Sequence, residues 1–485
     1  MKQKKNIIIF IISVIISLII LCFFVTGYYS IDTYRIWSQG YIDYATKDAY
    51  IRDGRLFSAL IFVIIGLLNP TILTMYIINL IIAIIILSIC VIQIYNLIER
   101  YKKIENTKNK IIVFMLSYTY IFNFLIVDVV KFIDSFVIST SILLFIIAIK
   151  KIIIEKKNKL GFLLTILGVI CYQGTIPVYI ATAIFVALLE NKKINKEYFK
   201  RIIPCAISIF IAALLSVAIV NLVPMITQME MTERITTIDV SENVAKNFMN
   251  MNKIIFDSFY MFPPYVWIGI SLFIICISIV IGMMKKKLEF SINVLFIFMS
   301  FIGALLVMLP IQIFLGAARV VLVLGQAISA MLIYIYCTNF KNEKMNLYQK
   351  MIVGVIVIYF VITIISIMKS TYDYKLGNII DQEFSEKIEN EIVELEEQGI
   401  EIHKIGIRYA INDKKNREYG KLVFEQSTYL KGMYTVSLHE FYTGRHLTTV
   451  QDFTEELEQT YFENPSDQEL QFKNIDDVLY ILIDL

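Results

Sequence analysis

Aspartate and arginine side chains are concentrated in residues 27–55, directly after the first apolar run of the chain. Asp32 lies a few residues past that run and is followed by Arg35, and the same segment ends at Asp53 and Arg55. A carboxylate at a membrane surface can act as a general base, and the forked donors of arginine suit a phosphate or pyrophosphate. We therefore predict a base and a phosphate clamp in this segment.

A second group of charges lies farther along the chain. Asp128, Lys131 and Asp134 follow one another at i, i+3 and i+6 between two apolar runs, and Arg319 opens a later run. Taken one at a time, such charges are explained more simply by snorkelling or by pairing with each other. Ionisable groups beside membrane helices are nevertheless costly, so a set of them on one face favours a functional site.

The composition places these residues in a membrane protein. Of the 485 residues, 57% are hydrophobic, and the mean hydropathy is +0.68. Apolar runs of at least about 18 residues recur, which is enough helix to cross a hydrocarbon core of about 30 Å. The first run, residues 6–26, follows three lysines but is too long for the core of a signal peptide, and we expect it to be a retained helix. The fold class that follows is an all-α polytopic membrane protein.

The basic residues predict an orientation. Six connections that carry 24 lysines and arginines alternate with four that carry nine. The basic group is expected in the cytoplasm together with the N-terminus, which leaves the loops at 27–55 and 224–264 on the outer face. About 11 crossings satisfy this pattern: 6–26, 71–98, 111–127, 135–154, 160–172, 176–189, 202–223, 265–284, 290–309, 320–338 and 351–368.

Two apolar stretches need a special interpretation. Residues 56–68 are followed by Asn69 and Pro70, a helix break, and a crossing there would place the basic residues near position 100 outside. We predict a short helix in or against the outer leaflet. The stretch 160–189 must enter and return as a thin hairpin whose tip holds Tyr172 and Gln173. A polar turn at that depth needs cover from protein or water; the alternative is an ordinary turn at the surface.

Residues 370–485 differ from the membrane region, residues 1–369. Between positions 369 and 485 there are 24 acidic and 12 basic residues, and apolar positions follow helical and then strand spacing. We predict a small α/β or α+β domain outside the cytoplasm. Its three histidines, at positions 403, 439 and 446, are interpreted as surface residues. All six cysteines lie in apolar runs, so neither disulfides nor a zinc site are expected. No nucleic-acid motif is present, and that partner is not expected.

Four short motifs and their order along the chain resemble the serotype-converting, O-antigen-modifying glucosyl transferases of the Gtr type. More distantly, they resemble membrane glycosyltransferases of the GT-C type. The resemblance covers nearly the whole chain, because the order of helices and the modest outer C-terminal domain are also similar. The motifs are Asp32-Thr33-Tyr34-Arg35, Gly54-Arg55-Leu56-Phe57, Tyr172-Gln173 and Arg319-Val320. One departure affects the base: the family often has two adjacent acids in the first loop, and Ile31 replaces the first one here. Asp43 and Asp53 are therefore alternatives to Asp32.

The resemblance implies an enzyme of the bacterial cell membrane that takes a sugar, typically glucose, from a polyprenyl-phosphate carrier. The acceptor would be a hydroxyl of a cell-surface polysaccharide on the outer side. No cofactor is expected, although Asp128 and Asp134 leave a divalent metal open. Three other classes remain: a polymerase of lipid-linked repeat units, a flippase for a lipid-linked sugar, and a non-enzymatic scaffold. A scaffold would explain the fold but not the clustered outer arginines and aspartates. A flippase would need polar groups along its whole path, whereas the polar groups here gather at the outer edge.

Overall fold

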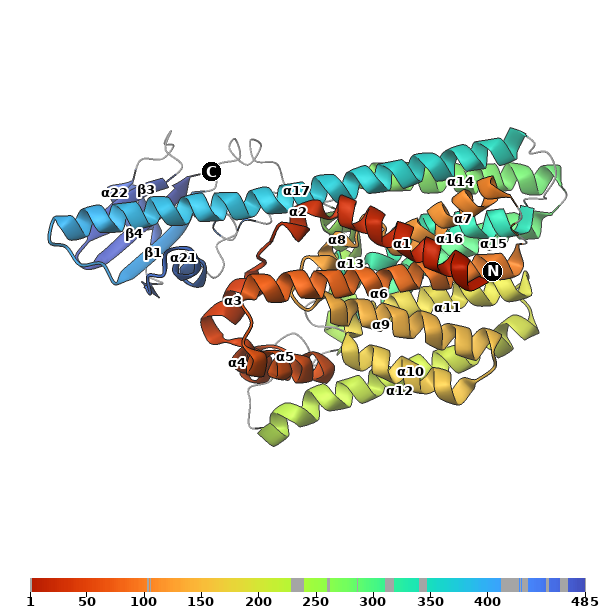
Figure 1. Cartoon of the computed structure of the whole chain (residues 1–485), viewed down its shortest axis with the longest axis horizontal. Helices are drawn as coiled ribbons and strands as arrows, with labels where there is room; N and C mark the ends of the chain where they lie inside the picture. Colours follow the sequence, from red (N-terminus) through yellow and green to blue (C-terminus); the bar gives the residue numbers. More distant parts are fainter. Residues whose placement is uncertain are drawn as a thin grey trace.

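The long apolar runs of the sequence form an elongated bundle of helices, with a small sheet carried at one end, in a computed structural model (Figure 1). The structure describes residues 2–102, 104, 106–227, 240–259, 262–285, 287–309, 318–339, 347–410, 427, 429, 435–450, 453–462 and 470–484. Parts of the expected outer loops 224–264 and 310–319, and of the basic connection 341–350, lie outside these residues. The N-terminus and the sheet lie at opposite ends of the bundle (Figure 1).

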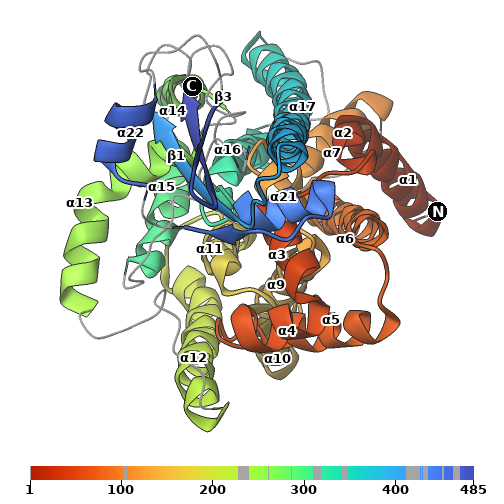
Figure 2. The same ribbon diagram turned by 90° about the vertical axis from the view of Figure 1, so that its left-hand side faces the viewer.

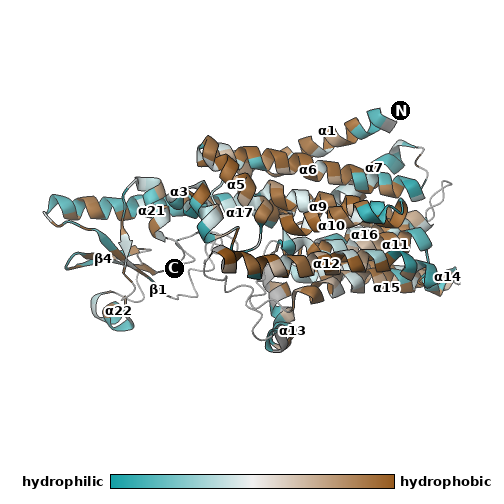
Figure 3. Cartoon of the chain, turned by 90° about the horizontal axis from the view of Figure 1, so that it is seen from below, coloured by the Kyte–Doolittle hydropathy of each residue, from teal (hydrophilic) through white to brown (hydrophobic). Residues whose placement is uncertain are grey.

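Nine helices within the described residues are long and apolar enough to cross a membrane. They are α1 (Lys2–Ile20), α6 (Ile72–Tyr101), α9 (Ser135–Ile149, continued by η2, Lys150–Ile154), α11 (Ile176–Asn191), α12 (Lys196–Thr227), α14 (Pro264–Met284), α15 (Leu288–Gly303, continued by η5, Ala304–Met308), α16 (Leu322–Asn339) and α17 (Leu347–Glu397). Figure 3 shows that apolar residues dominate these helices within the bundle, and that α17 becomes hydrophilic toward the sheet. The chain is therefore a polytopic membrane protein.

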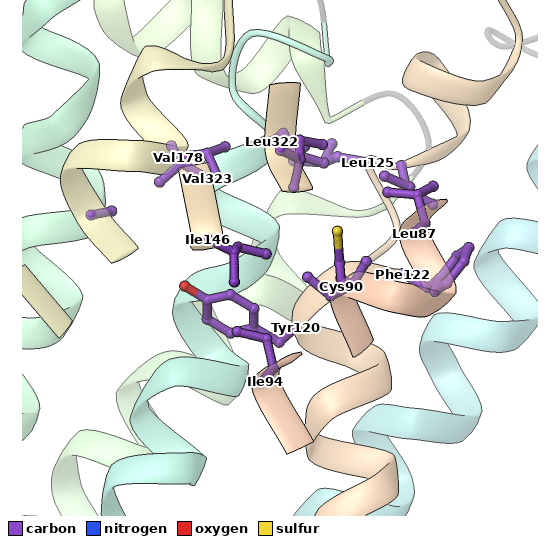
Figure 4. Packing of buried hydrophobic residues seen from close by; sticks show 14 of the residues in the cluster. Leu87, Cys90, Ile94, Tyr120, Phe122, Leu125, Ile146, Val178, Leu322 and Val323 are labelled. Atoms are coloured by element: carbon purple, nitrogen blue, oxygen red, sulfur yellow. The ribbon is translucent and has the colours of Figure 1, made fainter. Parts of the chain in front are cut away.

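The two other predicted crossings are shorter. They are α7 (Thr107–Ile121) and α10 (Asn158–Cys171), with 15 and 14 residues. The helix predicted over 111–127 ends early because the side chain of Asn123 accepts a hydrogen bond from the backbone of Leu125 at 3.0 Å. That turn leads into the single turn α8 (Val127–Val130). The buried centre of the bundle is filled by side chains from four long helices, from α7 and from the turn after α7 (Figure 4): Leu87, Cys90, Ile94, Tyr120, Phe122, Leu125, Ile146, Val178, Leu322 and Val323.

Residues 27–55, which we call the first outer segment after its predicted side, are largely helical rather than a loop. The segment contains α3 (Ile31–Gln39), α4 (Tyr41–Asp43) and η1 (Tyr44–Asp48); α2 (Cys22–Val25) precedes it and α5 (Leu56–Leu68) follows. Figure 2, which looks along the bundle, shows α4 and α5 lying across it while α6 and α17 are seen end-on. The α5 helix ends where Asn69 adopts a left-handed conformation, with φ of 44°, before Pro70. This geometry agrees with the predicted short helix that does not cross.

Residues 224–264, predicted as the second outer loop, include a helix that the sequence did not predict, α13 (Val240–Ser258).

The helix α17 also differs from the prediction. Separate helices were predicted on either side of position 370, but α17 has 51 residues and runs without interruption from the bundle into the tail. The tail is thus joined to the membrane region by a stiff helix.

The tail contains a four-stranded sheet in the order β2-β1-β4-β3. Strand β1 pairs in parallel with β2 and β4, and β3 pairs antiparallel with β4. The elements are β1 (Lys404–Ala410), α21 (Thr435–Thr443), β2 (Thr448–Thr449), α22 (Glu455–Tyr461), β3 (Leu470–Ile475) and β4 (Val478–Asp484). Alternate residues of β4 face opposite sides: Leu479 and Ile481 join the core shared with α17, whereas Tyr480 and Leu482 face a second cluster with Phe453.

The surface interpretation of the histidines is wrong for one of the three. His439 on α21 is fully buried and contacts Glu389 at 3.2 Å. His403 and His446 keep about three quarters of their side chains exposed. Helical spacing places His439 on the face of α21 that packs against α17, and only that packing buries it.

Candidate functional site

The first outer segment positions two of the predicted charges on α3. The helix begins after Ser30, whose backbone N–H donates to the Thr33 hydroxyl at 3.0 Å. Asp32 lies in the first turn, where the helix dipole favours a carboxylate, and 34% of its side chain is exposed. Arg35 forms an ion pair with Asp48 and lies 3.8 Å from Asp32. Asp32 therefore remains accessible beside an arginine that two acids hold in place.

A tight turn directly before Arg55 sets the direction of its side chain. Gly54 has a φ of 70°, and a Cβ there would come within 2.4 Å of Val220, so only glycine fits. The guanidinium of Arg55 lies 3.3 Å from Asp53 and 4.0 Å from Asp134, and over the ring of Tyr172. Within the described part of the chain, it makes these ion pairs but no hydrogen bond. Its donors are thus held in place and remain available to an incoming oxygen.

Arg319 and Lys131 hold the second group together. Arg319 donates to Asp128 from its backbone at 2.9 Å and to the Tyr172 hydroxyl from Nε at 3.0 Å. Lys131 contacts Asp128 at 2.6 Å and donates to the hydroxyl of Tyr374, on α17, at 3.1 Å. Both oxygens of Asp128 are therefore engaged by cations.

The hairpin tip joins the two groups. Tyr172 is 5% exposed, so the tip is covered by protein rather than placed as an ordinary surface turn. Its ring lies under Arg55 and its hydroxyl accepts from Arg319. The amide of Gln173 donates to the backbone carbonyls of Asp53 and Gly54, at 3.3 Å each. The tip thus fixes the turn that aims Arg55.

Asp128 and Asp134, six residues apart, have pKa values shifted in opposite directions. Burial raises the pKa of Asp128, but Lys131 and Arg319 outweigh it and lower the pKa below its usual range. Burial also raises the pKa of Asp134; Arg55 only partly opposes this, and the charge of Asp32 adds to it. Burial lowers the pKa of Arg55, yet Asp53 and its other partners raise it above the usual value. The site therefore keeps its cations charged while it destabilises one carboxylate.

The structure brings together ten of the eleven predicted residues and separates one. Asp43 points away, with half of its side chain exposed and a pair to Lys47 one turn on. Three contributors were not predicted: Asp48, Phe132, whose ring lies 4.4 Å from the Arg319 guanidinium, and Tyr374. Phe132 stands inside the charged segment 128–134 and could have been included. Tyr374 lies more than 240 residues from Lys131, and no local pattern marks it.

No group of three or more histidine, cysteine, aspartate or glutamate side chains arranged to hold a metal ion is found among the residues that the structure describes. Asp128, which the sequence left open as a ligand, already binds Lys131 and Arg319. What this arrangement offers is an accessible carboxylate on α3 beside fixed guanidinium groups and buried acids.

Comparison with known proteins gives one match. The model of a family described as "Glucosyl transferase GtrII" matches residues 21–334, about two thirds of the chain. The matched region includes every site residue predicted from the sequence. No curated protein and no solved structure matches significantly.

Proposed function

The chain belongs to the GtrII glucosyl transferase family, and from this premise we propose that it transfers glucose from a polyprenyl-phosphate carrier to a cell-surface polysaccharide. The family makes it a membrane glycosyltransferase. The carrier, the acceptor and the outer face are our proposal, and so is the placement of the N-terminus in the cytoplasm of a bacterial cell.

The observation that carries the proposal is Arg55. A guanidinium that lies between two acids and an aromatic ring, without a hydrogen bond in the described chain, has donors free for a phosphate. Such a group stabilises the charge that develops on a leaving polyprenyl phosphate. Arg319, which Tyr172 links to Arg55, adds a second fixed positive charge.

Asp32 completes the chemistry. The acceptor hydroxyl oxygen forms a bond to the anomeric carbon of the sugar, and the bond from that carbon to the phosphate oxygen breaks. The hydroxyl proton passes to Asp32, and the electron pair leaves with the polyprenyl phosphate. Asp32 is the accessible acid on the helix that also holds Arg35, and its negative charge raises the pKa of both Asp134 and Arg319.

The orientation rests on charge and shape. The basic connections predict the cytoplasmic end, and the N-terminus lies at the end of the bundle remote from the sheet (Figure 1). With the N-terminus inside, the site and the tail are on the outer side, where a surface polysaccharide is found. The short helix α5, which directly follows Arg55, lies across the bundle (Figure 2).

Membranes that contain the protein, supplied with radiolabelled polyprenyl-phosphoglucose and the purified surface polysaccharide, test the proposal. We expect label in the polysaccharide, and none with membranes that lack the protein. Movement of the labelled lipid across the membrane without transfer would identify a flippase. Extension of a lipid-linked oligosaccharide instead would identify a polymerase. Either result would overturn the proposal.

A further inference from the structure

A cavity of about 470 Å³ lies on the side of α3 where the first outer segment meets the tail. We call it the α3 cavity. Its walls come from α3, the start of α4, the turn between α5 and α6, and α21 of the tail. The lining residues are Tyr29, Ile36, Trp37, Gly40, Tyr41, Asn69, Pro70, Thr71, Ile72, Leu73 and Phe441.

Four of the eleven lining residues are aromatic, and none carries a charge. Trp37 and Phe441 contact each other edge to face, with ring centroids 5.5 Å apart, and Tyr29 packs on Phe441 at 4.8 Å. An uncharged lining does not suit a phosphate. Flat rings with few polar groups suit a neutral ligand that has an apolar face and hydroxyl groups, which is the character of a sugar ring.

Two polar groups, the indole N–H of Trp37 and the side-chain amide of Asn69, lie in the lining beside the rings. Trp37 is 37% exposed, and its indole N–H has no hydrogen-bond partner among the described residues. Asn69 is exposed and held in a left-handed conformation at the end of α5, and its side chain likewise has no partner within that part of the chain. An indole donor and an amide can bind sugar hydroxyls while a ring face of Trp37 contacts the C–H face.

A second cavity shows the contrast. The groove between α14 and α17, of about 750 Å³, is lined mostly by aliphatic side chains, together with Phe273, Cys276, Tyr348 and one charged residue, Lys285. That lining suits acyl chains of the bilayer. The α3 cavity differs in having its aromatic rings next to free polar groups, at the end of the bundle that holds the charged site.

The position fits an acceptor. Trp37 is five residues beyond Asp32 on the same helix, which is a rise of about 7.5 Å and a turn of about 140° around the helix axis. A saccharide that reaches both residues therefore passes along and partly around α3. Phe441, which contacts Trp37, belongs to the tail, so the cavity needs both parts of the chain.

We propose that the α3 cavity is a saccharide subsite that binds the acceptor polysaccharide next to the unit that receives glucose. The assignment rests on the proposed function. Trp37 provides the stacking surface, Asn69 binds hydroxyls, and Phe441 holds the tail against α3.

Tryptophan fluorescence tests binding without catalysis. The chain has two tryptophans, and Trp267 is buried with its indole donating to the Leu324 carbonyl at 3.0 Å. In the full chain carrying Trp267→Phe, the emission reports Trp37 alone. Oligosaccharides cut from the surface polysaccharide should cause a saturable change, and polyprenyl phosphate should not. No change with the oligosaccharides, or an equal change with polyprenyl phosphate, would overturn the subsite.

Kinetics supply a second measurement. Trp37→Ala should raise KM for the polysaccharide about tenfold, as expected for the loss of an aromatic contact, with kcat and the donor KM unchanged. Trp37→Phe should retain part of the binding. Tyr461→Ala, which removes an exposed aromatic of the tail outside the cavity, should behave as wild type. If the wild-type chain changes its fluorescence with oligosaccharide yet transfers no glucose, the proposed function fails while the subsite stands. A transfer reaction with an unchanged acceptor KM in Trp37→Ala overturns the subsite alone.

Discussion

Charged side chains gather at both ends of the helix bundle, and the two ends use them differently. At the site, Asp128 is 1% and Asp134 8% exposed, and their partners come from segments as distant as Arg319. At the other end, Glu190 pairs with Arg100 and Arg201, whose side chains are 49% and 26% exposed. Charges at the second end reach water, as anchoring residues do, whereas Asp128 and Asp134 at the first end are kept from it.

The difference teaches that burial and the number of partners, rather than the charge itself, mark the site. Each site cation contacts both an acid and an aromatic ring, as Arg55 does with Asp53 and Tyr172. Such contacts fix the direction of the donors before a substrate arrives, which is the condition for electrostatic stabilisation of a transition state.

The strongest test of this difference is the removal of the proposed base. Asp32→Asn should lower the transfer rate by about 10²–10⁴-fold, the usual loss for a general base, while expression and membrane insertion stay normal. Radiolabel transfer in membranes measures it. Asp43→Asn, at an exposed carboxylate of the same segment, is the matched control and should keep the wild-type rate. Normal transfer in Asp32→Asn together with none in Asp53→Asn would move the base to Asp53.

Arg55 should show the next largest effect. Arg55→Ala should raise KM for the polyprenyl donor by about 10–100-fold, since a charge-assisted bond to phosphate contributes about 1.5–3 kcal/mol. Arg55→Lys should recover part of it, because a lysine keeps the charge but loses the fork. Arg100→Ala, at the other end of the bundle, should leave KM unchanged. Equal effects of Arg55→Ala and Arg100→Ala would contradict the distinction between the two ends.

Stability should separate the two ends as well. Asp128→Asn leaves Lys131 and Arg319 buried without their shared carboxylate, and breaking a buried pair costs about 3–5 kcal/mol. Glu190→Gln affects cations that reach water and should cost about 1 kcal/mol or less. Thermal unfolding of the purified chain in detergent should therefore show a larger fall for Asp128→Asn. An equal fall in the unfolding temperature of the two variants would contradict the idea that burial distinguishes the charges at the site from those at the other end.

The smallest effect concerns the tail. Burial lowers the pKa of His439, and the opposing charge of Glu389 does not restore it. Below about pH 6.5, the ordinary value, the unfolded chain binds the proton more tightly than the folded chain. Stability should thus fall as pH drops from about 6.5 through the lowered pKa. His439→Gln should reduce this slope relative to wild type in thermal unfolding at several pH values. The exposed His403→Gln should not, and an equal reduction by both would refute the role of burial.

Much of the fold was predictable because hydropathy is a local property. An apolar run of sufficient length must form a helix in lipid, whatever its neighbours are, and this gave the nine long helices, the short α5 and the thin hairpin. The same local reasoning marked Asp32, Arg55 and Tyr172 as candidate site residues, because they lie next to those apolar runs. This reasoning did not predict the continuous α17, because the apolar run ends near position 369. Hydropathy alone does not show that the helix continues through the polar residues that follow.

The sequence by itself thus determined that this is a polytopic membrane glycosyltransferase and which segments hold its charges. Only the tertiary structure decided that Asp43 turns to solvent, that Tyr374 joins Lys131, and that His439 is buried. The physical reason is that transfer of a segment into lipid depends on its own residues, whereas a site forms where separate helices pack. Tyr172 could be recognised as polar at a hairpin tip, but its place between Arg55 and Arg319 depends on three segments meeting.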